Sequence, residues 1–455
     1  DLVEHALAAA TGPTVAFVTE HREANLRWAA NSLTTNGEMR GRTLTVVATV
    51  PAEGGTAAGT VSRAVATLAE AADAVAVATA AARSAPAAED AYPLVEDYGH
   101  GDDWGAPAED ASIDVLSGFA TDLGGVFGDA ADRDHLLFGF AELVAETTYL
   151  GSTTGLRRRA VSPAGRLELN AKTADLAGSA WHGVGTRDFS DVDVAAAYET
   201  LSTRLGWGAR PLELPAGRYE TLLPPSAVAD LMIYTYWSAA ARDAEEGRTV
   251  FSRPGGGTRL GQRLSELPVR LWSDPTYSGL ECPPFVIAAS SGGGLQSVFD
   301  NGLPLAATDW LADGELRNLV RSRAWADRTG QPVRPPVDNL ILDAAGGAGL
   351  EEMVARTERG LLLTCLWYIR EVDPERLLLT GLTRDGVYLV EDGEVRGAVN
   401  NFRWNESPVE LLGRLSEVGR SEPVLPREWN DWFTRTVMPP IRVPDFHMST
   451  VSPAS

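Results

Sequence analysis

The sequence predicts an α+β protein with an N-terminal α/β domain, a mixed middle region and a β-dominated C-terminal domain. β-Branched runs at residues 14–19 and 43–50 are typical of strands. An alanine-rich stretch at 62–83 has helical periodicity. Beyond Arg218 the chain is rich in glycine and in short strand-like runs, which favours a β-dominated domain. Because 455 residues exceed the size at which single cores usually stop growing, we expect two or three domains.

The first predicted domain covers residues 1–88. Its two β-branched runs flank Asn36-Gly37, a pair that tolerates the positive φ of a tight turn, so we expect a small antiparallel sheet with its turn there. In the alanine-rich stretch, four residues recur at helical spacing and predict the buried face of a helix. These residues are Val65, Leu68, Ala69 and Ala72.

A linker is predicted at residues 89–110. This stretch holds eight acidic residues and no Lys or Arg, together with Pro93, Pro107 and several glycines. A metal site built from these acids is conceivable. We expect a solvated loop instead, because acids scattered along a flexible backbone seldom converge.

The middle α+β domain is predicted to span residues 111–215. Asp110 or Ser112 can cap a helix in which one apolar stripe recurs at helical spacing. The stripe consists of Leu116, Phe119, Leu123, Val126 and Phe127. Strand-like runs follow at 136–169, with a turn expected at 162–165 (SPAG), and residues 192–205 predict another helix before the proline-rich boundary.

The C-terminal β-rich domain is predicted to span residues 216–455, with one helix after Ser226 and another around 350–359. Apolar runs at 387–390 and 395–399 flank a turn that contains Asp392-Gly393. Asp-Gly between such runs is a strong hairpin signal.

The net charge argues against two classes of partner. The chain has 39 Lys and Arg against 62 Asp and Glu, a formal charge of −23, and its one basic run at 157–159 is short. A nucleic-acid or anionic membrane surface would be repelled. No apolar stretch approaches the roughly 18 residues of a membrane-spanning helix. Residues 1–10 lack a secretory pattern, so we expect a cytoplasmic protein.

The sequence lacks the motifs of several catalytic mechanisms. A single lysine, Lys172, has no Gly-rich loop before it, which excludes a P-loop, and no G-x-S-x-G elbow is present. Cys282 and Cys365 lie 83 residues apart in apolar surroundings. They predict two buried free thiols rather than a disulfide.

A polar segment directly follows the C-terminal hairpin. Asn side chains donate and accept together, and Arg offers a planar fork of donors, so this segment can hold another chain's backbone or fix a loop. We select four residues as candidates for substrate binding. They are Asn400, Asn401, Arg403 and Asn405.

The same region has a family resemblance. The sequence VYLVEDGEV at 387–395, followed by NFRWNESP at 401–408, resembles the C-terminal signature of the TldD/PmbA family. Residues 25–37 (NLRWAANSLTTNG) resemble the family's N-terminal hairpin. The resemblance implies a bacterial protein associated with zinc-dependent peptide hydrolysis.

The zinc motif of the family is missing. By resemblance, catalytic members bear H-E-x-x-x-H on the helix that opens the C-terminal domain, where two His hold zinc and Glu activates water. The comparable helix at 226–238 has no His, and its only acid is Asp230. Across the chain the closest two histidines are 16 residues apart. The histidines are His5, His21, His100, His135, His182 and His447.

These absences indicate the TldE/PmbA-type branch. The resemblance then implies a non-catalytic subunit, without a cofactor of its own, that pairs with a zinc-bearing TldD-like chain in proteolysis or peptide maturation. Two alternatives stay open: a stand-alone hydrolase with a metal site from distant residues, and a peptide-binding scaffold without a peptidase partner. Twelve tryptophans and the aromatic strings at 234–237 and 429–433 suit a heterodimer interface, although a large core explains them equally well.

Overall fold

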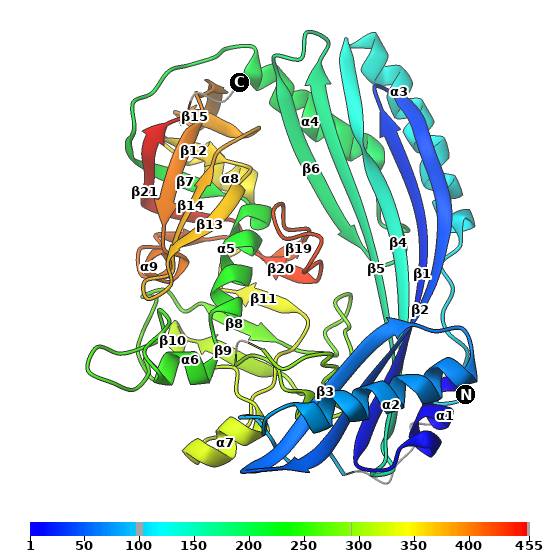
Figure 1. Ribbon diagram of the computed structural model, residues 1–455. Coiled ribbons are helices and arrows are strands. Elements are labelled where there is room, and N and C mark those ends of the chain that lie inside the picture. The colour runs from blue at the N-terminus through cyan, green and yellow to red at the C-terminus, as the bar shows by residue number, and fades with distance from the viewer. Residues whose placement is uncertain (97–102, 293, 453–455) are drawn as a thin grey trace.

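The computed structural model describes residues 1–96, 103–292 and 294–452. Within these residues the chain forms three β-sheets with helices packed against them, a mixed and β-rich α+β fold that confirms the predicted fold class. A sheet of very long strands forms one side of the molecule, and two sheets of shorter strands form the other (Figure 1).

The long sheet has the order β3-β2-β1-β4-β5-β6. Its strands are β1 (Thr14–Ala29), β2 (Ser32–Ala52), β3 (Gly55–Ala64), β4 (His135–Ser152), β5 (Arg157–Thr173) and β6 (Ser179–Thr186). It therefore joins strands from the predicted N-terminal and middle domains. The proposed boundaries at 88, 110 and 215 remain predictions about independent folding units.

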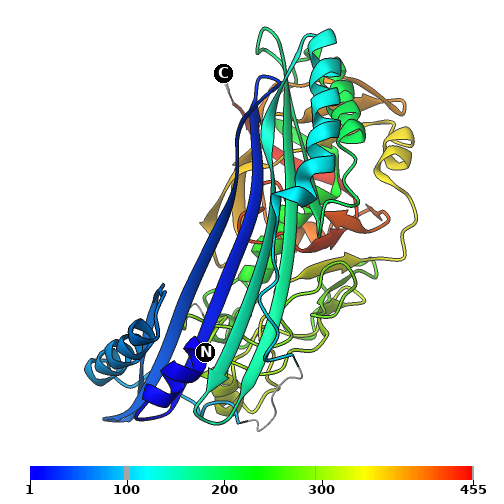
Figure 2. The ribbon, with the colours of Figure 1, turned by 90° about the vertical axis from the view of Figure 1, so that its right-hand side faces the viewer.

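Helices cover one face of the long sheet (Figure 2). They are α1 (Leu2–Ala9), α2 (Leu68–Ser84), η1 (Ile113–Leu116), α3 (Ser117–Asp132) and α4 (Val194–Gly208). Because side chains alternate along a strand, Ala16 and Val18 face α1 and α2, while Ala24 and Leu26 face α3 and α4 on the same side. The opposite face is left for the C-terminal half of the chain, and Phe17 on that face packs with Phe299.

The C-terminal half contains two sheets. One has the order β10-β9-β8-β11-β20-β19, and the other has the order β13-β14-β17-β21-β7-β12-β15-β16 with β18 paired to β21. The strands of the first are β8 (Arg270–Ser273), β9 (Thr308–Ala312), β10 (Glu315–Leu316), β11 (Leu340–Asp343), β19 (Glu422–Val424) and β20 (Thr436–Met438). Those of the second are β7 (Gly217–Leu223), β12 (Arg359–Leu363), β13 (Trp367–Asp373), β14 (Leu378–Leu382), β15 (Val387–Glu391), β16 (Glu394–Ala398), β17 (Phe402–Glu406), β18 (Glu417–Val418) and β21 (Ile441–Val451).

The helix α5 (Pro225–Trp237) lies in the core of the C-terminal half. It packs with buried residues of both C-terminal sheets, including Leu271 of β8 and Trp404 of β17. Shorter helices are η2 (Val298–Asp300) and α6 (Ala241–Glu245), α7 (Arg323–Thr329), α8 (Leu350–Ala355) and α9 (Pro408–Leu412). No helix among the described residues is long and apolar enough to cross a membrane.

Several local predictions are confirmed. β15 and β16 form the expected hairpin, and Asp392 and Gly393 adopt positive φ at its turn. Ser112 caps η1, which leads directly into α3 and its buried stripe. Cys282 and Cys365 are buried free thiols.

Two turns were placed wrongly. Asn36 and Gly37 lie within β2, opposite Leu26 and Asn25, and the hairpin turns instead at Ala30-Asn31, where both residues have positive φ. Residues 162–165 lie within β5 rather than in a turn. Pro163 is tolerated there because β6 pairs only with residues 165–172 of β5, which leaves Pro163 on a free edge.

Two helix predictions also need correction. α2 starts later than expected because Thr67 and Glu70 form a capping box, with Thr67 Oγ1 accepting from Glu70 N–H at 3.3 Å. The buried face of α2 consists of Ala71, Ala74, Val75, Ala78 and Ala82, and Leu68 is exposed. α8 ends at Ala355, short of the predicted 359, because the chain then enters β12.

Candidate functional site

The acid on α5 has a structural role. Asp230 is fully buried, and its carboxylate accepts hydrogen bonds from the backbone N–H groups of Arg427 (3.3 Å), Glu428 (2.9 Å) and Trp429 (3.3 Å). Burial raises the pKa of Asp230 well above its usual range, and the three donors oppose this. The carboxylate therefore fixes a segment that lies 197–199 residues further along the chain to the helix.

That segment, residues 427–435, joins the C-terminal half to the long sheet. Arg166 of β5 donates to Asn430 Oδ1 at 2.8 Å and also pairs with Asp431. On the other side, Trp429 packs edge-to-face against Tyr234 and Trp237 of α5. The aromatic strings singled out in the sequence thus largely contact each other within this chain.

A cleft of about 610 Å³ lies beside this segment, between the long sheet and the C-terminal end of α5. Its long-sheet wall is polar and includes Thr19, Glu146, Thr148 and Ser162. The opposite wall is rich in apolar and aromatic side chains from α5, from 283–305 and from 336–337. Trp432 lines it as well and is 77% exposed. A polar wall that faces an aromatic wall suits a ligand with both amide groups and side chains, such as a peptide.

The charged groups that line the cleft each have a partner. Glu146 Oε1 lies 3.3 Å from His21 of the same sheet face, which in turn lies 3.3 Å from Glu23 Oε2. Arg435 and Asp338 form an ion pair of 3.1 Å on the opposite wall. These groups give the cleft polar anchors at both walls.

Candidate nucleophiles are inactive in this environment. Burial raises the pKa of the Cys282 thiol and of the Cys365 thiol to about 12, so both are protonated at neutral pH. Tyr236 ends beneath the cleft, and its hydroxyl donates to Val337 O (3.0 Å) and accepts from Val337 N–H (2.8 Å). Burial also raises the pKa of Tyr236.

The residues around α5 do not fit a zinc ion. Zinc sites in proteins use three or four converging His, Cys or carboxylate ligands. Among residues 1–96, 103–292 and 294–452, no group of three or more such side chains is arranged to hold a metal. Part of the acidic stretch considered for metal binding, residues 97–102, lies outside the described residues, and this part includes His100.

The four candidates for substrate binding do not line this cleft. Asn400 Oδ1 accepts from Leu214 N–H at 2.7 Å, and Asn405 Oδ1 accepts from Ser449 Oγ at 2.7 Å. Arg403 is exposed and has one long contact, 3.4 Å, to Thr380 Oγ1, while Asn401 O accepts from Ser452 N–H. β17 lies between β14 and β21, so this segment is not at an open sheet edge. Its role in substrate binding remains a prediction.

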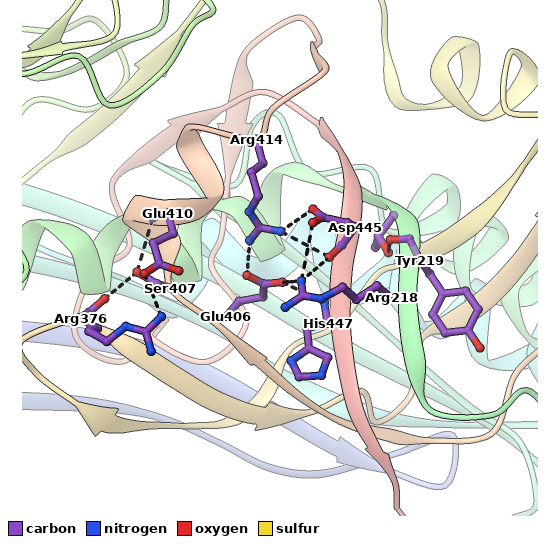
Figure 3. Close-up of polar contacts among 10 residues, drawn as sticks. Arg218, Tyr219, Arg376, Glu406, Ser407, Glu410, Arg414, Asp445 and His447 are labelled. Carbon is purple, nitrogen blue, oxygen red and sulfur yellow. Dashed lines mark hydrogen bonds and ion pairs between the residues drawn. The ribbon is translucent and has the colours of Figure 1, made fainter.

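The end of the same segment forms an ionic network around the buried Glu406 (Figure 3). Glu406 is only 4% exposed and pairs with Arg414, and it accepts from His447 N–H at 2.8 Å. Arg414 also reaches Asp445 Oδ1 at 2.5 Å. Burial raises the pKa of Glu406, and Arg414 lowers it. This network ties β17 to β21.

Sequence reasoning missed the cleft and singled out only part of its border. Trp432 belonged to the aromatic string at 429–433, and Tyr236 and Trp237 belonged to the string at 234–237. The polar wall gave no signal, because isolated Thr, Ser and Glu residues on long strands are common on any solvated sheet face.

Comparisons with known proteins agree with this architecture. A family model described as the PmbA/TldA metallopeptidase C-terminal domain matches residues 216–450. TldE from Thermococcus kodakarensis is similar over 98% of both chains, with 16% sequence identity and a TM-score of 0.79. No curated protein sequence gives a significant match.

Two further solved structures share the fold. A protein described as a candidate modulator of DNA gyrase from Thermotoga maritima has 17% identity and a TM-score of 0.72, over 96% of this chain and 95% of that one. A similarly described protein from Bacteroides thetaiotaomicron has 13% identity and a TM-score of 0.75, over 99% and 97%.

Proposed function

Because this chain belongs to the PmbA/TldD metallopeptidase family, we propose that it is a TldE/PmbA-type subunit that binds peptide while a zinc-bearing TldD-like chain cleaves it. The resemblance to TldE from Thermococcus kodakarensis supports this branch. In this proposal the chain works in the cytoplasm, in proteolysis or peptide maturation, and supplies one wall of the cleavage chamber.

The main support comes from α5. This is the helix on which the family resemblance expects zinc ligands, and its single acid is occupied by three backbone donors. A carboxylate that accepts three internal hydrogen bonds has little capacity left to bind a metal or to activate water. In this proposal, hydrolysis takes place at a zinc site that a partner chain carries.

The cleft supplies the substrate surface in this proposal. Extended peptides need partners for their backbone amides and pockets for alternate side chains. Thr148 and Ser162 offer hydroxyl groups on one wall, and Trp432 offers an aromatic face on the other. An aromatic ring that projects into a cleft provides contact area at low entropic cost.

The isolated chain is expected to contain less than about 0.1 zinc per molecule, because tight zinc binding requires several converging ligands. The measurement is elemental analysis of protein purified without chelator, alone and after assembly with a TldD-like chain that carries H-E-x-x-x-H. Zinc and peptidase activity should appear only in the assembly. Close to one zinc per isolated chain would favour the stand-alone hydrolase instead.

Trp432→Ala is expected to reduce peptide turnover by the assembled complex about tenfold, with an unchanged melting temperature, because its side chain is mostly exposed. Arg403→Ala is a matched variant, since Arg403 is also exposed and its guanidinium contacts Thr380 Oγ1 at the long distance of 3.4 Å. The test measures turnover and melting temperature of both variants. A loss of turnover with Arg403→Ala alone would assign the substrate site to residues 400–405 instead of the cleft.

A scaffold role is the remaining alternative. It predicts peptide binding by this chain without any gain of activity on mixing with a TldD-like chain. Light scattering of the mixture separates the two, because the proposed function requires a heteromeric complex and the scaffold role does not.

A further inference from the structure

A second pocket of about 310 Å³ lies against the start of the segment 427–435. It is bounded by β5 of the long sheet, by the start of β13 and by residues 427–431. Asp431 lines this pocket, and the next residue, Trp432, lines the cleft. Neighbouring residues of one short segment therefore line the pocket and the cleft.

The pocket is organised around Arg427. The guanidinium lies over the ring of Trp367, 4.0 Å from its centroid, and 5.0 Å from that of Trp181. The side chain is 13% exposed. Stacking between two indoles fixes the plane of the guanidinium without using its hydrogen-bond donors.

The N–H donors of this guanidinium have no close acceptor among the described residues. Among the residues that the structure describes, the buried Nε of Arg427 has no hydrogen-bond partner, and neither does the indole Nε1 of Trp367 beside it. The ion pair of Arg427 with Glu168 is long, at 3.8 Å between Nη1 and Oε2. A mostly buried guanidinium without close acceptors is costly, and because Nε itself is buried, a ligand would meet the terminal nitrogens of Arg427.

The acids of the pocket are already engaged by other donors. Glu168 accepts from Trp181 Nε1 at 2.9 Å, and Asp431 pairs with Arg166. Glu428 accepts from the backbone N–H groups of Tyr368 (3.3 Å) and Ile369 (3.1 Å). Arg370, exposed at the pocket, lies 3.6 Å from Glu428 and adds a second positive charge. The pocket thus places a guanidinium without a close acceptor beside carboxylates that each already accept hydrogen bonds from other groups.

We propose that this pocket binds a carboxylate of the peptide, with Arg427 as the residue that receives it. A planar guanidinium matches a carboxylate in a two-point hydrogen-bonded pair. A monoanion suits the site better than a phosphate, because the lining holds three acids against two arginines and repels a dianion more strongly than a monoanion. This inference rests on the proposed peptide-binding function and narrows its substrate class to peptides with an acidic group at a fixed distance from the cleft.

The carboxylate can come from the peptide C-terminus or from an acidic side chain. Three peptides distinguish these sources: one with a free C-terminus and no Asp or Glu, its C-terminal amide, and the amide with one Glu added. Binding of each is measured by fluorescence anisotropy to the full-length chain, alone and in complex with the TldD-like chain. We expect at least one carboxylate-bearing peptide to bind about tenfold or more tightly than the plain amide.

Variants then assign the effect to Arg427. Arg427→Gln should weaken binding of the carboxylate peptide about tenfold to a hundredfold and leave binding of the amide unchanged. Arg359→Gln, an exposed arginine on β12 that lies outside the pocket, is the matched control. Melting temperatures of both variants are recorded, and the comparison of acid with amide on the wild-type chain requires no variant at all.

Equal affinity of the wild-type chain for acid and amide peptides would overturn the carboxylate site and leave the peptide-binding proposal intact. An equal loss for acid and amide on Arg427→Gln would overturn the role of Arg427. Absence of binding by every peptide, alone and in the complex, would overturn both proposals together.

Discussion

Asp230→Ala is expected to lower the free energy of unfolding by about 3–5 kcal/mol, because it leaves three backbone N–H groups without their acceptor. The carboxylate is fully buried, so water cannot replace it without opening the interface between α5 and residues 427–429. Urea unfolding measures the loss. Hydrogen exchange at the amides of residues 427–429 locates it, and these amides should lose their protection first.

The matched control is Asp230→Asn, which retains one carbonyl oxygen of the same reach. We expect it to lose only about 1–2 kcal/mol, because one acceptor still serves part of the backbone cluster. Unfolding of Asp230→Ala at the wild-type urea midpoint would show that the segment is held by its aromatic contacts with Tyr234 and Trp237 instead.

Comparing wild type with Asp230→Asn also predicts how the stability depends on pH. Burial raises the pKa of Asp230, and a carboxyl with a higher pKa in the folded chain stabilises it most below the unfolded pKa of about 3.9. That contribution is lost as the pH rises through the folded pKa. Wild type should therefore lose stability relative to Asp230→Asn as the pH rises from about 4. A relative gain with rising pH would mean that the three backbone donors outweigh burial.

Elements with a local signal were predictable from sequence. The hairpin β15–β16 follows from Asp392-Gly393, and η1 and α3 follow from the cap at Ser112 and its apolar stripe. The turn at Asn36-Gly37 failed for a non-local reason. β1 pairs with β2 and β4 along nearly its whole length, so the hairpin turn moves to Ala30-Asn31 and the Asn-Gly pair is absorbed into the ladder.

The candidate site was less predictable because its parts are distant in sequence. Thr19 and Trp432 line one cleft from opposite ends of the chain, and neither is unusual by itself. Strand periodicity also divides the polar segment that sequence reasoning favoured. Phe402 and Trp404 point into the core, while Arg403 and Asn405 lie on the opposite face of β17.

Glu406 lies on the same inward face of β17 as Phe402 and Trp404, so this buried position holds a charged residue. The carboxylate has one close cation, Arg414, with Arg218 further away at 3.9 Å. Removing one partner of a buried ion pair costs more than removing both, because the remaining charge stays desolvated. We therefore expect the pair to specify how β17 aligns with β21 more than it adds net stability.

Arg414→Gln is accordingly expected to destabilise the protein by about 3 kcal/mol, and Glu406→Gln by a similar amount. The double variant should lose clearly less than the two single losses combined, with a coupling energy of about 1–3 kcal/mol. The measurement is a double-mutant cycle by urea unfolding at pH 7. Additive losses would show that the two side chains act independently. Peptide affinity of each folded variant should equal that of wild type, because neither Glu406 nor Arg414 lines the cleft or the Arg427 pocket.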